Sequence, residues 1–210
     1  VVNAAVATTQ AVAELTLGFM FSLVREIPRA DASMKAGQWL KKEFNGAELF
    51  GKTLGIIGFG NIGSTVGKYA QALGMNVLAF DPFRDQANII AQGAECVSFD
   101  ELLSRSDMIS IHAPYKEQNH HLINDEAFAK MKDGVFLVDD ARGGIVDEEA
   151  LLRALESGKV RGAALDVYEK EPPINWDLVK HPKVIATPHI GAQTKEAQCR
   201  AAVDISTEVL

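Results

Sequence analysis

The sequence has few of the features that mark disulfide-bonded or membrane proteins. Only two cysteines occur in 210 residues, Cys96 and Cys199, and their spacing fits neither a metal site nor a redox motif. We therefore expect free thiols, no bound metal and a cytoplasmic location. The longest apolar run, residues 15–24, is interrupted by Thr16 and Ser22 and is too short to span a membrane.

Basic residues are also scarce. Lys and Arg number 21 against 28 Asp and Glu, which gives a formal net charge of −7, and no Lys/Arg cluster is present. Such a chain is not suited to binding nucleic acid, because the phosphate backbone requires a basic surface. Hydrophobic residues make up 47% and charged residues 23% of the chain, which is ordinary for a globular domain. We expect neither a nucleic-acid nor a membrane partner.

Short apolar segments alternate with amphipathic ones from residue 53 onward. Strands are expected at 53–57, 76–80, 95–97, 108–112, 134–138, 162–167 and 184–186, and helices at 62–73, 99–104, 147–156 and from 194 to the end. A long helix is expected over 10–38, bent or broken near its middle by Pro28. This alternation predicts an α/β protein of Rossmann type, a doubly wound parallel sheet with helices on both faces and a long N-terminal helix.

A glycine-rich turn, residues 58–63 (GFGNIG), lies between the first predicted strand and the next helix. Gly58 allows the tight turn, Gly60 lets a pyrophosphate approach the backbone, and Gly63 lets the helix pack closely on the strand. The N–H groups of Asn61 and Ile62 would point at phosphate oxygens, assisted by the helix dipole. This motif in this context predicts a dinucleotide-binding site.

Asp81 ends the second predicted strand, where an acidic residue in this fold accepts hydrogen bonds from the adenine ribose. A carboxylate there also repels a 2′-phosphate, so we predict NAD rather than NADP. Arg84 lies nearby and is a counter-indication, because an arginine is able to hold a phosphate.

Four polar residues fall at or after the ends of predicted strands in the second half of the chain: Arg142, Asp166, Glu171 and His189. Ligands of doubly wound sheets bind beyond the carboxyl ends of the strands. Oxidation of a hydroxy acid requires a group that accepts the hydroxyl proton, and histidine titrates near neutral pH. A carboxylate orients such a histidine, and an arginine binds a substrate carboxylate through two parallel hydrogen bonds.

Four segments in order resemble the successive signatures of the D-isomer-specific 2-hydroxyacid dehydrogenases, and the resemblance covers essentially the whole chain. These segments are 58–63 (GFGNIG), 141–147 (ARGGIVD), 164–172 (ALDVYEKEP) and 187–191 (TPHIG). Within the family the chain is most similar to the D-3-phosphoglycerate dehydrogenases, on the basis of 33–39 (SMKAGQW), 49–55 (LFGKTLG) and 191–198 (GAQTKEAQ).

The resemblance implies a role for each candidate residue. Arg142 would bind the substrate carboxylate and polarise the carbonyl, His189 would be the general acid and base, and Glu171 would be its partner. Asp166 would contact the nicotinamide end of NAD. Further cofactor contacts are implied at His112, Ala113, Pro114, Asp140, Ala141, Gly191 and Ala192.

The implied reaction is the reversible oxidation of 3-phospho-D-glycerate by NAD, the entry step of serine synthesis. Residues 1–210 would form the NAD-binding domain with flanking interdomain helices, and a homodimer would form through the long first helix and its loop. The substrate domain that precedes this domain in the family is absent from the chain, so we expect the chain alone to show little or no turnover.

One departure from the family concerns Asp139 and Asp140, which replace the more usual Asn and small residue. They would weaken binding of an anionic substrate or indicate a different one, unless one or both turn away and cap the loop. Two functional alternatives stay open. One is another D-2-hydroxyacid dehydrogenase; the other is a non-enzymatic NAD(H)-sensing protein similar to transcriptional corepressors, which resemble the family and keep the same triad.

Overall fold

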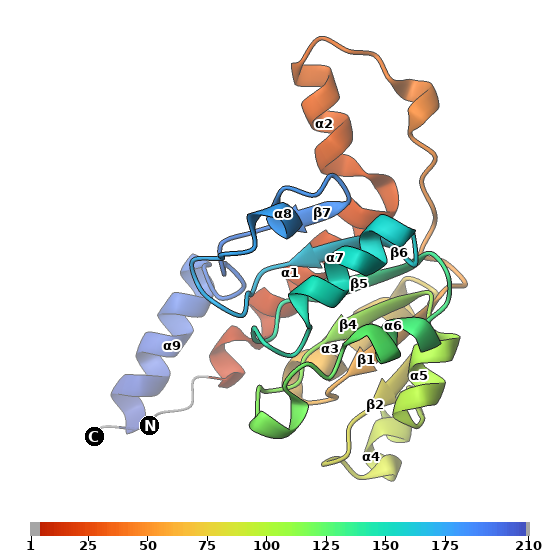
Figure 1. Cartoon of the computed structure of the whole chain (residues 1–210). Helices are drawn as coiled ribbons and strands as arrows, with labels where there is room; N and C mark the ends of the chain where they lie inside the picture. The colour runs from red at the N-terminus through yellow and green to blue at the C-terminus, as the bar shows by residue number, and fades with distance from the viewer. Residues whose placement is uncertain (1–4, 209–210) are drawn as a thin grey trace.

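A computed structural model describes residues 5–208 of the chain, with side chains described from residue 7 to residue 203. Seven parallel strands form one sheet in the order β3-β2-β1-β4-β5-β6-β7 (Figure 1). The strands are β1 (Thr53–Ile57), β2 (Asn76–Phe80), β3 (Glu95–Cys96), β4 (Met108–Ile111), β5 (Val135–Asp139), β6 (Val160–Leu165) and β7 (Val184–Ala186). The predicted Rossmann-type sheet is therefore confirmed.

The strand order reverses direction beside β1. From β1 the chain proceeds to β2 and β3 on one side, then returns to place β4 on the other side. Loops leaving neighbouring strands diverge at this point, so a crevice opens beyond the carboxyl ends of β1 and β4. The glycine-rich turn follows β1, and residues 112–114 follow β4. The topology thus brings the two segments together.

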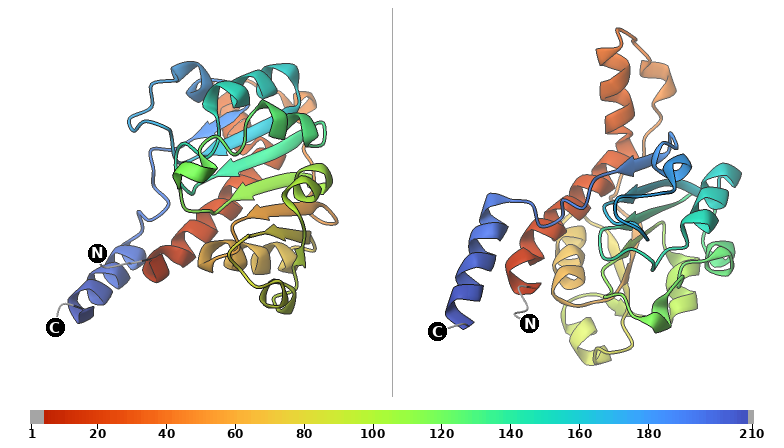
Figure 2. Two further views of the ribbon diagram at one scale, coloured as in Figure 1. Left: turned by 60° about the horizontal axis from the view of Figure 1, so that its bottom comes forward. Right: turned by 60° about the vertical axis from the view of Figure 1, so that its left-hand side comes forward.

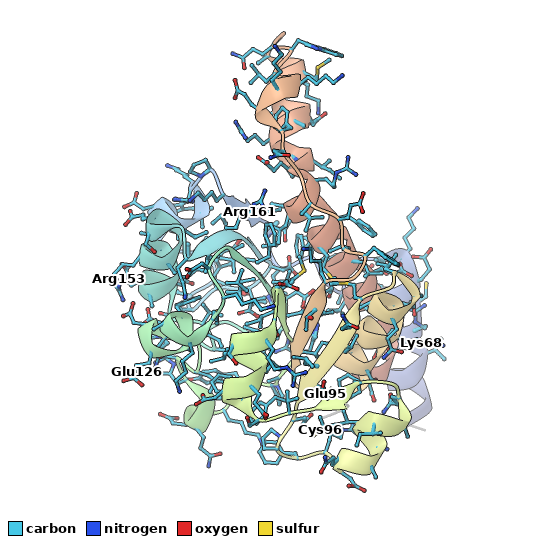
Figure 3. The ribbon with its side chains drawn as sticks, turned by 90° about the vertical axis from the view of Figure 1, so that its right-hand side faces the viewer. Lys68, Glu95, Cys96, Glu126, Arg153 and Arg161 are labelled. Atoms are coloured by element: carbon cyan, nitrogen blue, oxygen red, sulfur yellow. The ribbon has the colours of Figure 1, made fainter. Side chains whose placement is uncertain are left out.

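Helices cover both faces of the sheet. Beyond the N-terminal pair described below, the helices are α3 (Asn61–Ala72), α4 (Gln86–Ala91), α5 (Phe99–Arg105), α6 (Asp125–Lys130), α7 (Glu148–Ser157), α8 (Trp176–Val179) and α9 (Lys195–Glu208), with short 3₁₀ turns η1 (Lys41–Glu43) and η2 (Glu117–Asn119). In Figure 3, Arg153 of α7 and Glu126 of α6 lie on one side, and Lys68 of α3 lies on the other. The predicted final helix is α9; residues 209 and 210 lie outside the described residues.

Each face of the sheet has its own apolar core, because successive strand residues point to opposite faces. Ile56 of β1 belongs to the core beneath α3, with Val66 and Ala70 of that helix. Its neighbour Ile57 belongs to the core beneath α5, α6 and α7. Near-continuous apolar strands are what a sheet covered on both faces requires.

The long N-terminal helix is divided in two. Helix α1 (Ala5–Arg25) ends just before Glu26, which adopts a left-handed φ of 51°, and α2 (Ile27–Lys35) begins with Pro28 in its first turn. Pro28 has no N–H to donate to the preceding turn, so the predicted break is confirmed. Helix α2 ends at Lys35, three residues short of the predicted boundary. Together with the loop that follows, it projects from the body of the domain (Figures 1 and 2).

Helix α1 runs along one face of the sheet and contacts β5, β6, α3 and α9. Figures 1 and 2 show it side by side with α9. Residues Ala7–Arg25 are long and apolar enough to cross a membrane by length and composition alone, with a mean hydropathy of 1.2. Half of that stretch is buried inside the protein, including Phe19 and Met20. This packing is that of a core helix.

Candidate active site

The glycine-rich turn has the geometry of a phosphate cradle. Gly58 has a φ of +88°, and a Cβ there would lie 2.7 Å from the backbone nitrogen of Ala113. A Cβ on Gly63 would collide with the carbonyl oxygen of Gly58. Gly60 differs, because beyond its neighbours a Cβ there would have only the Arg84 guanidinium, at 4.0 Å. The turn is thus tightly packed at Gly58 and Gly63 and open at Gly60, as an approaching pyrophosphate requires.

Asp81 follows β2 directly and lies beside this turn. Its Oδ2 accepts a hydrogen bond from the N–H of Phe59 at 2.8 Å, and its Oδ1 accepts one from Phe83 at 2.9 Å. Each carboxylate oxygen has further lone pairs for ribose hydroxyls. The backbone therefore orients the carboxylate at the edge of the predicted adenosine site.

Beyond the carboxyl ends of β4, β5 and β6 lies a cavity of about 550 Å³. Eleven of the predicted site residues line it: Ile62, His112, Ala113, Pro114, Asp140, Ala141, Arg142, Asp166, His189, Gly191 and Ala192. Sequence reasoning missed three others, Thr8, Val12 and Tyr115. Thr8 and Val12 belong to α1, and only the packing of that helix across the strand ends brings them to the cavity.

His189 and Glu171 form a pair at the edge of this cavity. The Nδ1 atom of His189 lies 2.8 Å from Oε2 and 3.0 Å from Oε1 of Glu171. Both side chains are partly open to solvent, 45% and 42% exposed. Because Nδ1 faces the carboxylate, Nε2 is the ring nitrogen available to a substrate. His189 has a left-handed φ of 54°, a conformation that is costly for this residue and clusters at functional sites.

The turn that carries His189 is held by Asp166, which is 1% exposed. One carboxylate oxygen accepts from the Thr187 hydroxyl at 2.5 Å and from the Ile190 N–H at 2.8 Å, and the other accepts from the Gly191 N–H at 2.7 Å. Tyr168 supports the same turn by donating its hydroxyl to the Thr187 carbonyl at 3.0 Å. Burial, reinforced by the charge of Asp166, raises the pKa of Tyr168 to about 12.

The two unusual aspartates point inward. Asp139 accepts a hydrogen bond from the Ala141 N–H at 3.1 Å, so the capping interpretation is correct for this residue. Burial raises the pKa of the Asp139 carboxyl well above its usual range, and the nearby charges of Asp140 and Glu148 raise it further. The shift favours the protonated, uncharged form of the Asp139 carboxyl, which lessens its repulsion of an anionic ligand.

Asp140 joins a buried polar chain that connects α1 to two strand ends. One oxygen accepts from the Thr16 hydroxyl at 2.5 Å, and the other lies 3.3 Å from Nδ1 of His112, with both side chains wholly buried. The Nε2 atom of His112 lies 2.8 Å from the Ser110 hydroxyl. Thr16 thus satisfies one oxygen of Asp140, whereas the oxygen beside His112 has no hydrogen-bond partner among the described residues.

Arg142 follows β5, and its guanidinium donates to the Ala141 carbonyl at 2.6 Å. It forms no ion pair with any residue that the structure describes. An exposed guanidinium at a cavity edge, with further N–H groups available as hydrogen-bond donors, is suited to a carboxylate ligand. The structure thus brings Arg142 and His189 to one cavity, with Glu171 behind the histidine.

Residues 17–191 match the family model described as "D-isomer specific 2-hydroxyacid dehydrogenase, NAD binding domain". The chain belongs to this family. Its cofactor is therefore NAD, and the glycine-rich turn that follows β1 is consistent with that assignment. The predicted similarity to D-3-phosphoglycerate dehydrogenases is confirmed by a relative of that name from Bacillus subtilis (strain 168), 49% identical over 210 residues.

That alignment covers 100% of the chain but 40% of the Bacillus protein. A hydroxypyruvate reductase from Thermotoga maritima is 48% identical over 212 residues, covering 100% of the chain and 68% of that protein. Among solved structures, a D-lactate dehydrogenase from Aquifex aeolicus, complexed with NAD and lactic acid, matches with a TM-score of 0.88 and 36% identity over 96% of this chain and 65% of that one. A glyoxylate reductase from Paecilomyes thermophila matches with a TM-score of 0.89 and 40% identity, over 94% and 60% of the two chains.

Proposed function

We propose that this domain serves an NAD-dependent dehydrogenase that oxidises 3-phospho-D-glycerate to 3-phosphohydroxypyruvate. The observation that carries the proposal is the Glu171–His189 pair, which adjoins the same cavity as Arg142 and the residues expected around the nicotinamide. A proton acceptor, its orienting carboxylate and a carboxylate-binding arginine are the groups that oxidation of a 2-hydroxy acid requires.

The residues divide the chemistry as follows. NAD, when bound, supplies the acceptor for the hydride from the hydroxy-acid carbon. Nε2 of His189 takes the proton of the substrate hydroxyl, while Glu171 fixes the ring through Nδ1 and stabilises the imidazolium. Arg142 binds the substrate carboxylate and holds the reacting carbon in place. In the reverse direction His189 returns the proton to the carbonyl oxygen.

We propose further that a second domain closes over this cavity. His189 and Glu171 are nearly half exposed in the described chain, whereas hydride transfer is favoured where water is excluded. The chain also spans two fifths of its Bacillus relative. Without this second domain, the chain would still bind NAD but would turn over substrate weakly.

The choice of 3-phosphoglycerate depends on the names of relatives and on the three segments of this sequence that resemble D-3-phosphoglycerate dehydrogenases. A hydroxypyruvate reductase of nearly equal identity makes reduction of hydroxypyruvate the second candidate. Both named relatives are enzymes by name, which favours catalysis over an NAD(H)-sensing role.

The test uses the two-domain protein that we propose, assayed with 3-phosphoglycerate and NAD and separately with hydroxypyruvate and NADH. We expect a kcat/KM at least tenfold higher for the phosphorylated pair, and a loss of about 10²-fold or more in a His189→Gln variant, from the usual contribution of general acid–base catalysis. A preference for hydroxypyruvate would replace the substrate. Absence of turnover with either pair, together with NADH binding, would support the sensing role instead.

We also propose that the domain forms a homodimer through the projecting α2 segment. Four large apolar side chains on α1, α2 and the loop after them are exposed: Phe21 by 40%, Ile27 by 49%, Met34 by 55% and Trp39 by 75%. Ile27, Met34 and Trp39 belong to the projecting segment, and exposed apolar side chains of this size are typical of a protein–protein interface.

A further inference from the structure

The phosphate cradle lacks a positive charge of its own. The pyrophosphate of NAD carries two negative charges, whereas residues 58–63 offer only N–H groups and the positive end of a helix dipole. The only basic residue of α3, Lys68, comes about two turns into the helix and lies on its outer side (Figure 3). Any cation that binds the pyrophosphate therefore comes from another element.

Arg84 supplies one from the loop between β2 and α4. Its Nη2 atom lies 4.0 Å from the position of a Cβ on Gly60, and apart from adjoining residues it is the only neighbour within 4 Å. The guanidinium thus stands at the one open side of the cradle. A phosphate oxygen placed above Gly60 comes within hydrogen-bond distance of Nη2, about 2.8 Å for a charge-assisted pair.

Nothing in the described residues engages the Arg84 side chain. No carboxylate lies within ion-pair distance, and the guanidinium makes no hydrogen bond there. Asp81, three residues earlier, binds the N–H groups of Phe59 and Phe83 instead. Arg84 is therefore turned toward Gly60 and not held beside Asp81, where the 2′ position of the adenine ribose is expected.

We infer that Arg84 binds the pyrophosphate of the cofactor and is not a ligand for a 2′-phosphate. The positive charge of Arg84, which from the sequence alone counted against NAD, then strengthens the binding of NAD and NADP equally. Asp81 alone selects NAD over NADP. The inference rests on NAD binding and is independent of the substrate proposed above.

The test compares the chain with Arg84→Gln and Arg84→Lys variants by calorimetric titration of NADH, ADP-ribose and NADPH, with adenosine followed by ligand-observed NMR. Arg84→Gln should weaken NADH and ADP-ribose about 10- to 100-fold, the usual worth of hydrogen bonds to charged groups, and leave adenosine within twofold. Arg84→Lys should recover part of the loss. The ratio of NADPH to NADH affinity should not change.

Lys116→Gln is the matched control. This lysine contacts the residue before Arg84, because its Nζ lies 4.0 Å from the ring centroid of Phe83. The variant should bind NADH within twofold of the original chain. NADH affinity unchanged in Arg84→Gln would overturn the inference. So would an equal loss for adenosine, which would place Arg84 at the base, or a selective loss of NADPH, which would make it a 2′-phosphate ligand.

Discussion

Replacing Asp166 by alanine should destabilise the domain more than a typical point mutation does. The carboxylate is buried and accepts three hydrogen bonds from the turn that carries His189. Alanine leaves two backbone N–H groups and a hydroxyl without this acceptor. An unsatisfied buried donor costs roughly 1–3 kcal/mol; the Gly191 N–H is buried, whereas the bonds from Thr187 and Ile190 are part-buried and should cost less. Allowing for relaxation, we expect a loss of about 4 kcal/mol. At roughly 2–4 °C per kcal/mol for a chain of this size, Tm should fall by about 8–16 °C.

Calorimetric unfolding of the chain measures this loss directly. A Thr187→Val variant is the matched control, because it removes only the hydroxyl that donates at 2.5 Å and should cost about 1 kcal/mol. If Asp166→Ala lost no more stability than Thr187→Val, the carboxylate would not be the anchor of this turn. In the proposed two-domain enzyme the same variant should lower kcat more than it weakens NADH binding, because the displaced group is His189.

Three further predictions follow from the glycines, Asp139 and the projecting helix. Gly60→Ala should abolish NADH binding with little change in Tm, since a Cβ there meets only a flexible side chain. Gly58→Ala should lower Tm as well, because the φ of Gly58 is +88°. Thermal melts and NADH titrations of both variants check this, and an equal loss of Tm in the two variants would contradict it. The raised pKa of Asp139 means that the unfolded chain releases a proton above about pH 4 that the folded chain retains, so this residue favours the folded state less as pH rises. Asp139→Asn should therefore stabilise the domain more at about pH 7 than at about pH 4 in urea denaturation, and a gain independent of pH would refute the linkage. Trp39→Asp should yield a monomer in analytical ultracentrifugation without lowering Tm, and a dimer that persists would exclude this surface.

Much of the fold is readable from the sequence because the signals are local. The apolar run that becomes β1 and the glycines after it specify a buried strand, a tight turn and a helix start within a few residues. The same holds for the break between α1 and α2, where Pro28 acts on its own helix.

Three short helices were missed, α4, α6 and α8. They lie in polar segments with little apolar periodicity, but each begins at a capping side chain that accepts a backbone N–H: Asp85, Asn124 and Asn175. Those capping residues are the sequence signal for these helices.

The site was predictable only in part, for a different reason. Strand ends identify Arg142 and His189, because parallel strands deliver their following residues to one edge. Nothing local reveals that Thr16 donates to Asp140, more than a hundred residues away, or that Val12 lines the cavity. These contacts depend on where a helix docks, which sequence periodicity does not specify.

The docking of α1 also has a consequence for the order of events during synthesis. Its apolar face packs on β5 and β6, with Leu23 against Gly162 and Thr16 bonded to Asp140. A ribosome adds roughly 5–20 residues per second, so β5 and β6 emerge on the order of ten seconds after the helix itself. During that interval a segment as apolar as a membrane span is exposed in the cell, and nascent-chain binding factors that recognise such segments should engage it before the sheet is complete.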